Sequence, residues 1–168
     1  MSSNKGLSIT FPTRELVNLS NEAQRALAAE AHQVLDIVAV AVLSFTALDY
    51  VTKARGGTGT DGVKWDPLTA ATIRKRKRGK AKGKAKFGGA HEIGRDTGLQ
   101  LASLQPRHAG NKTFEPAAVT VLATRSYSVH FDKRRPIFPE TIPAEWMADI
   151  DEQVARYGAQ VLETVLNK

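Results

Sequence analysis

The sequence predicts an α+β fold, in which a long N-terminal helix and a C-terminal helix pack on a small antiparallel sheet. Two long stretches have the apolar spacing of a helix, and short stretches alternate as strands do. A run rich in glycine, lysine and arginine interrupts the chain. A chain of 168 residues fits one domain. We therefore expect a single domain over 1–168, with a flexible insertion at 56–95 that contains a short helix at about 67–78.

The N-terminal part predicts one strand and one long helix. Leu7–Phe11 alternates apolar and polar residues, as a short strand does. From Ser20 to Lys53 apolar residues recur every three or four positions, and Ser20 or Asn21 is a candidate cap for this helix. Its stretch Ile37–Leu43 is apolar on every side. That stretch must be covered on more than one side, either by a second element of the chain or by another subunit.

The middle of the chain predicts a hinge, a short helix and a low-complexity segment. Gly56–Gly62 is glycine-rich but lacks the Gly-Lys-Ser/Thr ending of a phosphate-binding loop, so we interpret it as a hinge. Asp66 is placed to cap a helix that has Pro67 at its first position and runs to about Arg78. The basic residues that follow have too little apolar surface to bury, which predicts a flexible segment.

A short helix and a turn are expected after the insertion. Asp96 or Thr97 would cap this helix, because each has a short side-chain oxygen that can accept from the free amides of a first turn. The helix would bury one or more of three leucines: Leu99, Leu101 or Leu104. The pair Gly110-Asn111 then indicates a turn.

The rest of the chain predicts strands and a final helix. Residues 104–131 are expected to form two or three antiparallel strands, and the clearest alternation is in Ala117–Thr124 and Tyr127–Phe131. Ala144–Leu166 is the strongest helical pattern of the chain, with an apolar face that includes Trp146 and Ile150.

The positive charge of the protein is concentrated in one segment. The net charge is +7, from 24 basic and 17 acidic residues. Nine of the basic residues lie in the segment Arg74–Lys86, which has no acidic residue, so the rest of the chain is close to neutral. We take these nine as candidate contacts to DNA or to an acidic partner: Arg74, Lys75, Arg76, Lys77, Arg78, Lys80, Lys82, Lys84 and Lys86.

A run of cations does not by itself select its anionic partner. Neutralising a polyphosphate backbone would give salt-dependent binding without sequence preference. The same run could dock on an acidic protein surface, or simply be solvated. Stacking on single-stranded nucleic acid is not favoured, because only Phe87 is an aromatic residue near the segment.

No pattern of residues predicts catalysis or a metal site. Asp96-Thr97-Gly98 matches the tripeptide of aspartic proteases, but no apolar strand precedes it and a helical pattern follows, which favours a helix cap. None of the four histidines pairs with another at helical spacing; they are His32, His91, His108 and His130. The chain has no cysteine. We expect no catalytic, cofactor-binding or metal-binding residues.

Membrane insertion and secretion are not expected either. The first residues contain no apolar run of signal-peptide length. The longest fully apolar stretch, Ile37–Leu43, is far shorter than the ~20 residues that cross a bilayer. We therefore expect a protein that is made and kept in a cytoplasm-like compartment.

A series of short motifs follows in a fixed order along the chain, formed by these residues: Trp65, Pro67, Leu68, Thr97, Gly98, Leu99, Ser103, Tyr127, His130, Arg135, Pro136 and Phe138. The order of these motifs resembles the virion-morphogenesis, or tail-completion, family of Mu-like tailed bacteriophages, and the resemblance extends from about Leu7 to the end of the chain. The chain departs from the family pattern around 131–139, where Ile137 separates the proline from the aromatic residue.

The resemblance implies a structural protein without catalytic residues. Such a subunit would form a homo-oligomeric ring, six-fold or related, in the neck or at the head-proximal end of the tail. The ring would be assembled in the cytoplasm of the bacterial host. Its implied partners are other neck, tail and head-connector proteins. We expect the basic segment to contact either genomic DNA or an acidic face of a neighbouring virion protein. The alternative is a small nucleic-acid-binding protein that uses 74–86.

Overall fold

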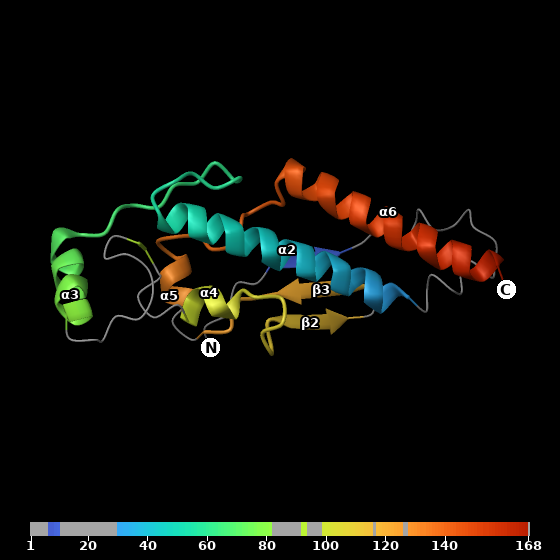
Figure 1. Ribbon diagram of the computed structural model, residues 1–168, viewed down its shortest axis with the longest axis horizontal. Helices are drawn as coiled ribbons and strands as arrows, with labels where there is room; N and C mark the ends of the chain where they lie inside the picture. Colours follow the sequence, from blue (N-terminus) through green and yellow to red (C-terminus); the bar gives the residue numbers. More distant parts are fainter. Residues whose placement is uncertain are drawn as a thin grey trace.

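The described part of the chain forms a sheet, two long helices and three shorter helices (Figure 1). The computed structural model describes residues 7–10, 30–81, 92–93, 99–115, 117–125 and 128–167. The elements in chain order are β1 (Leu7–Thr10), α2 (Ala31–Ala54), α3 (Ala70–Ala81), α4 (Leu99–Ser103), β2 (Lys112–Glu115), β3 (Ala118–Val121), α5 (Ser128–Asp132) and α6 (Ala144–Leu166). The α+β prediction is confirmed, and the strand expected at the start of the chain is β1.

The sheet is antiparallel and has β3 at its centre, in the order β1-β3-β2. Leu7 of β1 lies opposite Val121, and Lys112 of β2 lies opposite the same residue from the other side. Along β3 the side chains alternate between half-buried and buried positions, and Val119 and Val121 point into the core. Alternation at a period of two gives the sheet one face to cover.

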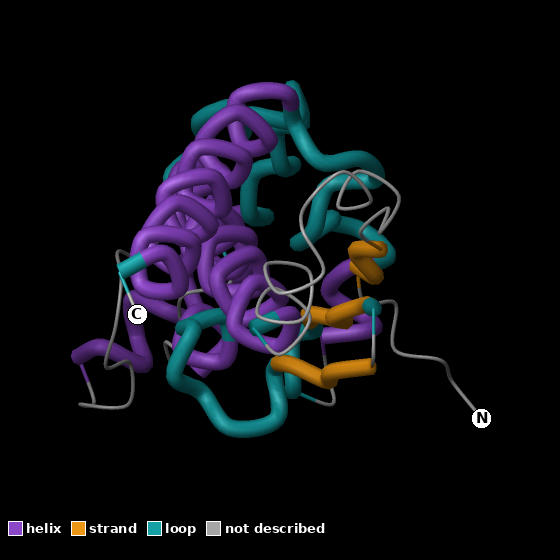
Figure 2. The backbone as a smooth tube through the Cα atoms, turned by 90° about the vertical axis from the view of Figure 1, so that its right-hand side faces the viewer, coloured by secondary structure: helices purple, strands orange, loops and turns teal. Residues whose placement is uncertain are grey.

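Helix α2 lies between α6 and the sheet (Figures 1 and 2). The core on its two sides includes Val38 and Val42 of α2, Val119 of β3, and Trp146 and Ile150 of α6. A helix with neighbours on opposite sides needs apolar residues around most of its circumference. The chain's own elements therefore cover the stretch Ile37–Leu43, and of the two predicted alternatives the second element is the one observed.

Helix α2 is long and apolar enough to cross a bilayer by length and composition, the one such helix in the part of the chain that the structure describes. The core helix of a globular protein passes the same test. Here half of its most apolar window is buried inside the protein, and the polar residues Asp49 and Lys53 are buried with it.

The predicted strand at Tyr127–Phe131 is wrong, because Ser128–Asp132 forms helix α5. The third strand of the sheet is β1 instead. A five-residue alternation is too short to distinguish a strand from one helical turn, so tertiary contacts decide. Phe131 packs against Tyr50 and Trp65, and the Asp132 side chain accepts from the Ile137 amide at 2.8 Å, which closes the turn after α5.

Helices α3 and α4 differ in part from the prediction, whereas α6 does not. Helix α3 begins at Ala70, and its cap is Thr69, whose hydroxyl accepts from the Thr72 amide at 3.3 Å; the predicted cap Asp66 is wrong. Helix α4 is present and Leu104 beside it is buried, as predicted, but Leu99 is 44% exposed. Helix α6 has the predicted bounds.

Candidate anion-binding surface

Half of the residues of α3 are cations. The sequence predicted that this helix ends at about Arg78 and that a flexible segment follows. The helix extends through Lys80 to Ala81. Arginine, lysine and alanine are strong helix formers, and Thr69 caps the first turn. The cations lie in the C-terminal two-thirds of the helix, where the helix dipole favours positive charge. These local effects stabilise a helix that has almost no apolar surface.

The burial pattern gives α3 an inner and an outer face. Its half-buried side chains are Thr72, Ile73 and Arg76, at the spacing that places them on one side of a helix. The exposed side chains on the rest of the circumference are Ala70, Ala71, Arg74, Lys75, Lys77 and Arg78. We call these six residues the outer face. Four of the candidate contacts therefore share one surface, whereas Arg76 lies on the inner face.

Arg76 connects the inner face of α3 to the body of the protein. Its guanidinium donates a hydrogen bond to the Glu92 carbonyl oxygen. The Glu92 carboxylate lies 3.8 Å from the Arg55 guanidinium, just after the end of α2. Next to it, the Ile93 amide donates to the Ala54 carbonyl at 2.8 Å, and the Ile93 side chain is buried. Figure 1 places α3 at one end of the molecule, beyond the C-terminal end of α2.

The segment before α3 is fixed by a buried aromatic cluster. Trp65 is 2% exposed and makes edge-to-face contacts with Tyr50 at 4.9 Å and with Phe131 at 5.2 Å between ring centroids. Its indole N–H donates to the Pro136 carbonyl oxygen at 3.1 Å. Arg135 donates to the Asp66 carbonyl oxygen at 3.2 Å. Two motif segments that are far apart in the sequence thus meet at the base of α3.

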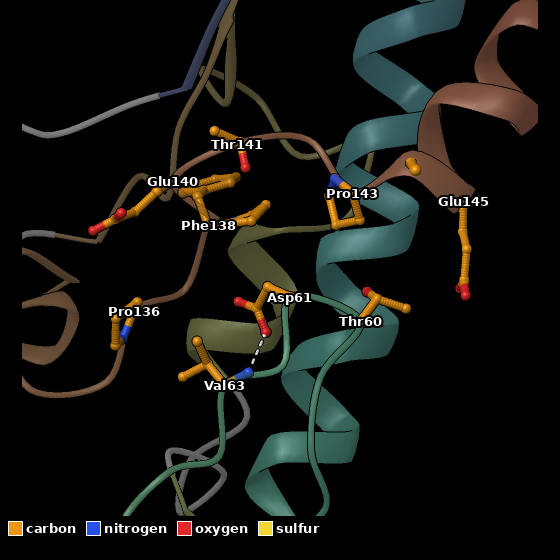
Figure 3. Close-up of a pocket in the computed structure, with 11 residues that line it drawn as sticks. Thr60, Asp61, Val63, Pro136, Phe138, Glu140, Thr141, Pro143 and Glu145 are labelled. Carbon is orange, nitrogen blue, oxygen red and sulfur yellow. Dashed lines mark hydrogen bonds between the residues drawn. The ribbon is translucent and has the colours of Figure 1, made fainter.

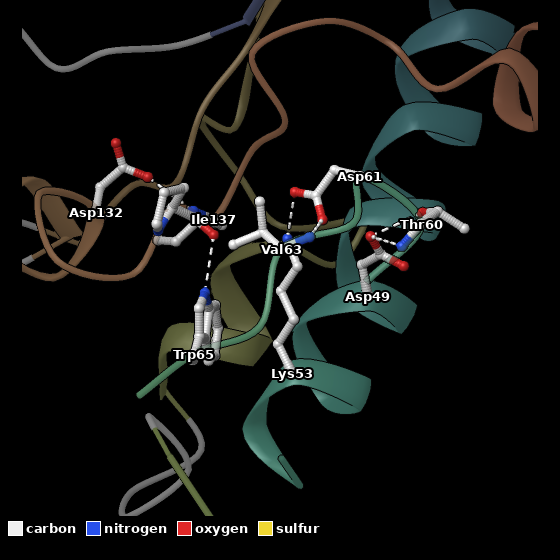
Figure 4. Close-up of polar contacts among 9 residues, drawn as sticks. Asp49, Lys53, Thr60, Asp61, Val63, Trp65, Asp132 and Ile137 are labelled. Atoms are coloured by element: carbon white, nitrogen blue, oxygen red, sulfur yellow. Dashed lines mark hydrogen bonds and ion pairs between the residues drawn. The ribbon is translucent and has the colours of Figure 1, made fainter. Parts of the chain in front are cut away.

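The glycine-rich loop, expected to be a hinge, is tied to α2 by a buried polar cluster (Figure 4). The Lys53 ammonium lies 2.5 Å from an Asp61 carboxylate oxygen, and both side chains are nearly inaccessible to solvent. Asp49, one turn before Lys53, accepts from the Thr60 amide at 2.9 Å and from its hydroxyl at 2.8 Å. The loop also closes on itself, since Gly59 donates to the Val63 carbonyl oxygen at 2.9 Å.

Gly59 is required by the close approach of the loop to this cluster. A Cβ atom there would overlap the Lys53 side chain and lie 2.7 Å from Asp61 Oδ1 and 2.8 Å from Asp49 Oδ2. A Cβ contact below about 3 Å forces one of the groups to move. The glycine content of the loop therefore has a packing cause here, which the sequence pattern alone did not reveal.

A cleft of about 540 Å³ lies between this loop and the connection from α5 to α6 (Figure 3). Asp61 is the acidic residue at its inner side, but one oxygen binds Lys53 and the other accepts from the Val63 amide. Glu140 and Glu145, which also line the cleft, are exposed, and Figure 3 shows them on opposite sides of Asp61. Both carboxylate oxygens of Asp61 are therefore occupied by contacts that hold the loop together.

The remaining candidate residues do not assemble into a centre of their own in the described chain. Ser103 is buried and donates to the Gln100 carbonyl at 2.7 Å, and Phe138 packs in the core. Among the described residues no group of three or more His, Cys, Asp or Glu could hold a metal ion. The following lie outside the described residues: Lys82, Lys84, Lys86, His91, Asp96, Thr97, Gly98 and Tyr127. For Lys80 and His130 only the backbone is described.

Sequence reasoning missed the buried cluster of Lys53, Asp49 and Asp61. One signal was present: Asp49 and Lys53 are charged residues near the end of an otherwise apolar helix, at a spacing that places them on one face. A charge in such a position needs a partner. Comparisons with protein-family models, with curated proteins and with solved structures find no match to this chain.

Proposed function

We propose that the protein is a structural subunit of a tailed-phage virion, which acts in tail completion or head–tail joining as part of a ring. The observation that carries the proposal is the meeting of two motif segments, 65–68 and 135–138, at the base of a cationic helix. Trp65 and Pro136 are joined by a hydrogen bond, and Arg135 donates to Asp66. Residues that define the resemblance from sequence thus act together as one structural unit.

The chemistry of the described polar groups also supports a structural role rather than catalysis. The side-chain hydrogen bonds of Asp49, Lys53 and Asp61 in the structure hold the glycine-rich loop together and against α2. A general acid or base needs a free proton-transfer position within reach of a substrate. These groups hold the glycine-rich loop in one position on the surface of the protein. A surface of fixed shape suits a protein that works by packing against other proteins.

The distribution of charge supports assembly next to an anionic partner. The body is close to neutral, and a ring of copies would repeat the cationic outer face of α3 several-fold. Repetition in a ring raises the effective affinity of a weak contact without any new interaction. The second candidate function, a small nucleic-acid-binding protein, is favoured by the same cationic face. It differs in predicting a stable monomer.

Deleting the gene from the phage that encodes it tests the proposal. We expect lysates with filled heads and separate tails, visible by negative-stain electron microscopy, and restoration of joined virions when the wild-type protein is supplied from a plasmid. Gold-labelled antibody against the protein should bind at the head–tail junction of intact virions. Normal joined virions from the deletion would refute the role.

Oligomeric state separates the two candidate functions. Size-exclusion chromatography with light scattering, repeated over a range of protein concentrations, should show an oligomer or a concentration-dependent shift in mass for a ring subunit. A monomer at every concentration that still binds DNA would favour the second candidate.

A further inference from the structure

We propose that the outer face of α3 binds duplex DNA by lying in the major groove and contacting phosphates on both of its walls. The inference deepens the proposed function and rests on it for the setting in which the protein meets DNA. It selects one partner among the anionic partners that the basic run could take.

The cations of the outer face spread over nearly half of the helix circumference. Successive residues of an α-helix are about 100° apart, so the four cations cover an arc of about 160°. In angular order they are Lys77, Arg74, Arg78 and Lys75. Arg76 lies opposite the middle of this arc and is bonded to the Glu92 carbonyl oxygen. The helix therefore presents charge in several directions away from the body.

A concave anionic surface matches this spread better than a flat one. The anionic groups of a flat or convex surface would reach only the middle of the arc, and Lys75 and Lys77 at its edges would point past that surface. The major groove of B-form DNA is about 12 Å wide and accepts an α-helix with its side chains. The groove has phosphates on both sides, so the cations at the two edges of the arc can contact phosphates at the same time.

The composition of the outer face favours double-stranded DNA over other nucleic acids. Binding of single strands uses aromatic side chains that stack on bases, and no exposed residue of α3 is aromatic. The major groove of A-form RNA is deep and too narrow for side chains to read. Ala70 and Ala71, which are exposed on the same face, are small enough to let the helix approach closely. The proposed contacts of the four cations are to phosphates, which carry no sequence information, so we expect binding without sequence preference.

The inner face keeps this surface in a fixed orientation. Trp65, a few residues before α3, is buried in the aromatic cluster, and Arg76 bonds the helix to the segment at Glu92. An element held at its base and along one side loses less conformational freedom on binding than a free chain. The fixed outer face is therefore a preformed contact surface.

The test compares two variants with the same loss of charge in the full-length protein. The outer-face variant carries Arg74→Gln, Lys75→Gln, Lys77→Gln and Arg78→Gln, and keeps Arg76. The control variant carries Lys64→Gln, Arg107→Gln, Lys133→Gln and Arg134→Gln, four cations that are exposed elsewhere on the body. Binding to a fluorescently labelled, mixed-sequence DNA duplex is measured by anisotropy between about 50 and 200 mM salt. Near-ultraviolet circular dichroism checks that both variants keep the native core.

We expect the outer-face variant to bind duplex DNA on the order of 100-fold more weakly at about 100 mM salt, and the slope of log affinity against log salt to fall by about 3. The control variant should change the slope by less than about 1. Equal losses in both variants would overturn the inference. Tighter binding of single-stranded DNA, of double-stranded RNA or of polyglutamate than of the duplex would also overturn it, and polyglutamate would identify an acidic protein surface as the partner.

The outcome can be separated from that of the proposed function. If the outer-face variant binds DNA normally while deletion of the gene leaves heads and tails unjoined, the inference fails and the function stands. If the outer-face variant loses DNA binding as expected while deletion leaves normal virions, DNA binding stands and the function fails.

Discussion

Helices α2 and α3 adjoin each other in the sequence, yet different forces stabilise them. In α2, eleven of 24 residues are buried, and Val42 and Leu43 are completely inaccessible. In α3, none of the side chains that the structure describes is buried, and most of the exposed ones are cations. Tertiary packing on two sides holds α2, whereas helix propensity, the Thr69 cap and the helix dipole hold α3.

The comparison shows in which elements residues can be substituted without loss of the fold. An element that contributes little buried surface opens at low free-energy cost and tolerates substitution. The cationic surface that we propose for binding lies on such an element. The polar cluster that ties the 56–64 loop to α2 lies between the two cases, because its charges are nearly buried but one of them, Asp61, belongs to a loop.

The largest expected effect is at the end of α2, where Lys53 is 1% exposed. The substitution Lys53→Met leaves the Asp61 carboxylate nearly buried without its cation, which should lower the free energy of unfolding by about 3–5 kcal/mol in urea denaturation. The matched change Lys64→Met, at an exposed lysine of the same loop, should cost less than about 0.5 kcal/mol. Adding Asp61→Asn to Lys53→Met should restore part of the loss. Equal stabilities of the two single variants would contradict the buried pair.

A second test measures the packing of α2 directly. Leu43→Ala removes a side chain that is 0% exposed and should lower the free energy of unfolding by about 3 kcal/mol. Leu48→Ala, on the same helix, removes a side chain that is 66% exposed and should change it by less than about 0.5 kcal/mol. A large loss from Leu48→Ala would instead indicate that this residue is covered in solution by another copy of the chain.

A smaller and local effect is expected at the start of α3. Thr69→Ala removes the cap and should destabilise α3 by about 1 kcal/mol, seen as faster hydrogen exchange of the amides of 72–78. Global unfolding in urea should be unchanged, because α3 buries so little. Thr58→Ala, at an exposed threonine before the helix, is the control and should leave both measurements unchanged. A fall in global stability with Thr69→Ala would mean that α3 belongs to the cooperative core.

The smallest effect concerns the contact between α6 and the residue before α2. The Tyr157 hydroxyl donates to Glu30 at 2.6 Å, and this hydrogen bond, followed by burial and by the negative charge of Glu30, raises the pKa of Tyr157 above its usual 10.0. The folded state therefore favours the neutral hydroxyl. The contribution of the hydrogen bond from Tyr157 to Glu30 to the free energy of unfolding is complete below pH 10. This contribution is lost as the pH rises through the raised pKa of Tyr157.

Ultraviolet titration of tyrosinate absorbance checks this shift. Tyr157 should ionise at a higher pH than a free tyrosine, and Tyr157→Phe should remove that step from the titration. Glu30→Gln keeps a side chain of the same size without the charge and should bring the pKa of Tyr157 back toward 10.0. Unchanged titration in Glu30→Gln would mean that the contact does not persist in solution.

The sequence was sufficient for elements whose pattern is long. Helix α6 has the expected bounds, because a period of 3.6 repeated over 23 residues outweighs local noise. The sequence prediction was wrong at Ser128–Asp132, because an alternating pattern of five residues is too short to distinguish a strand from a helical turn. The sequence prediction was also wrong at the end of the basic run, because the helix propensity of lysine, arginine and alanine extends α3 to Ala81 despite charge repulsion.

Of the candidate surface, the sequence identified the cations but not their arrangement. Which side of α3 faces outward depends on the bond from Arg76 to Glu92, across 16 positions of the chain. The base of the helix depends on the bond from Trp65 to Pro136, across 71 positions. Such contacts form only when long loops close, and no local pattern records which pairs will meet.

The amino-acid order alone determined which stretches are helical over many turns, that positive charge is confined to one segment, and that cysteine chemistry is absent. Tertiary structure decided that α6 and the sheet cover α2 from within the same chain, that a buried lysine holds the glycine-rich loop, and that four cations share one outer face. The reason is range: periodicity and charge are properties of neighbouring residues, whereas burial is a property of the whole packed chain.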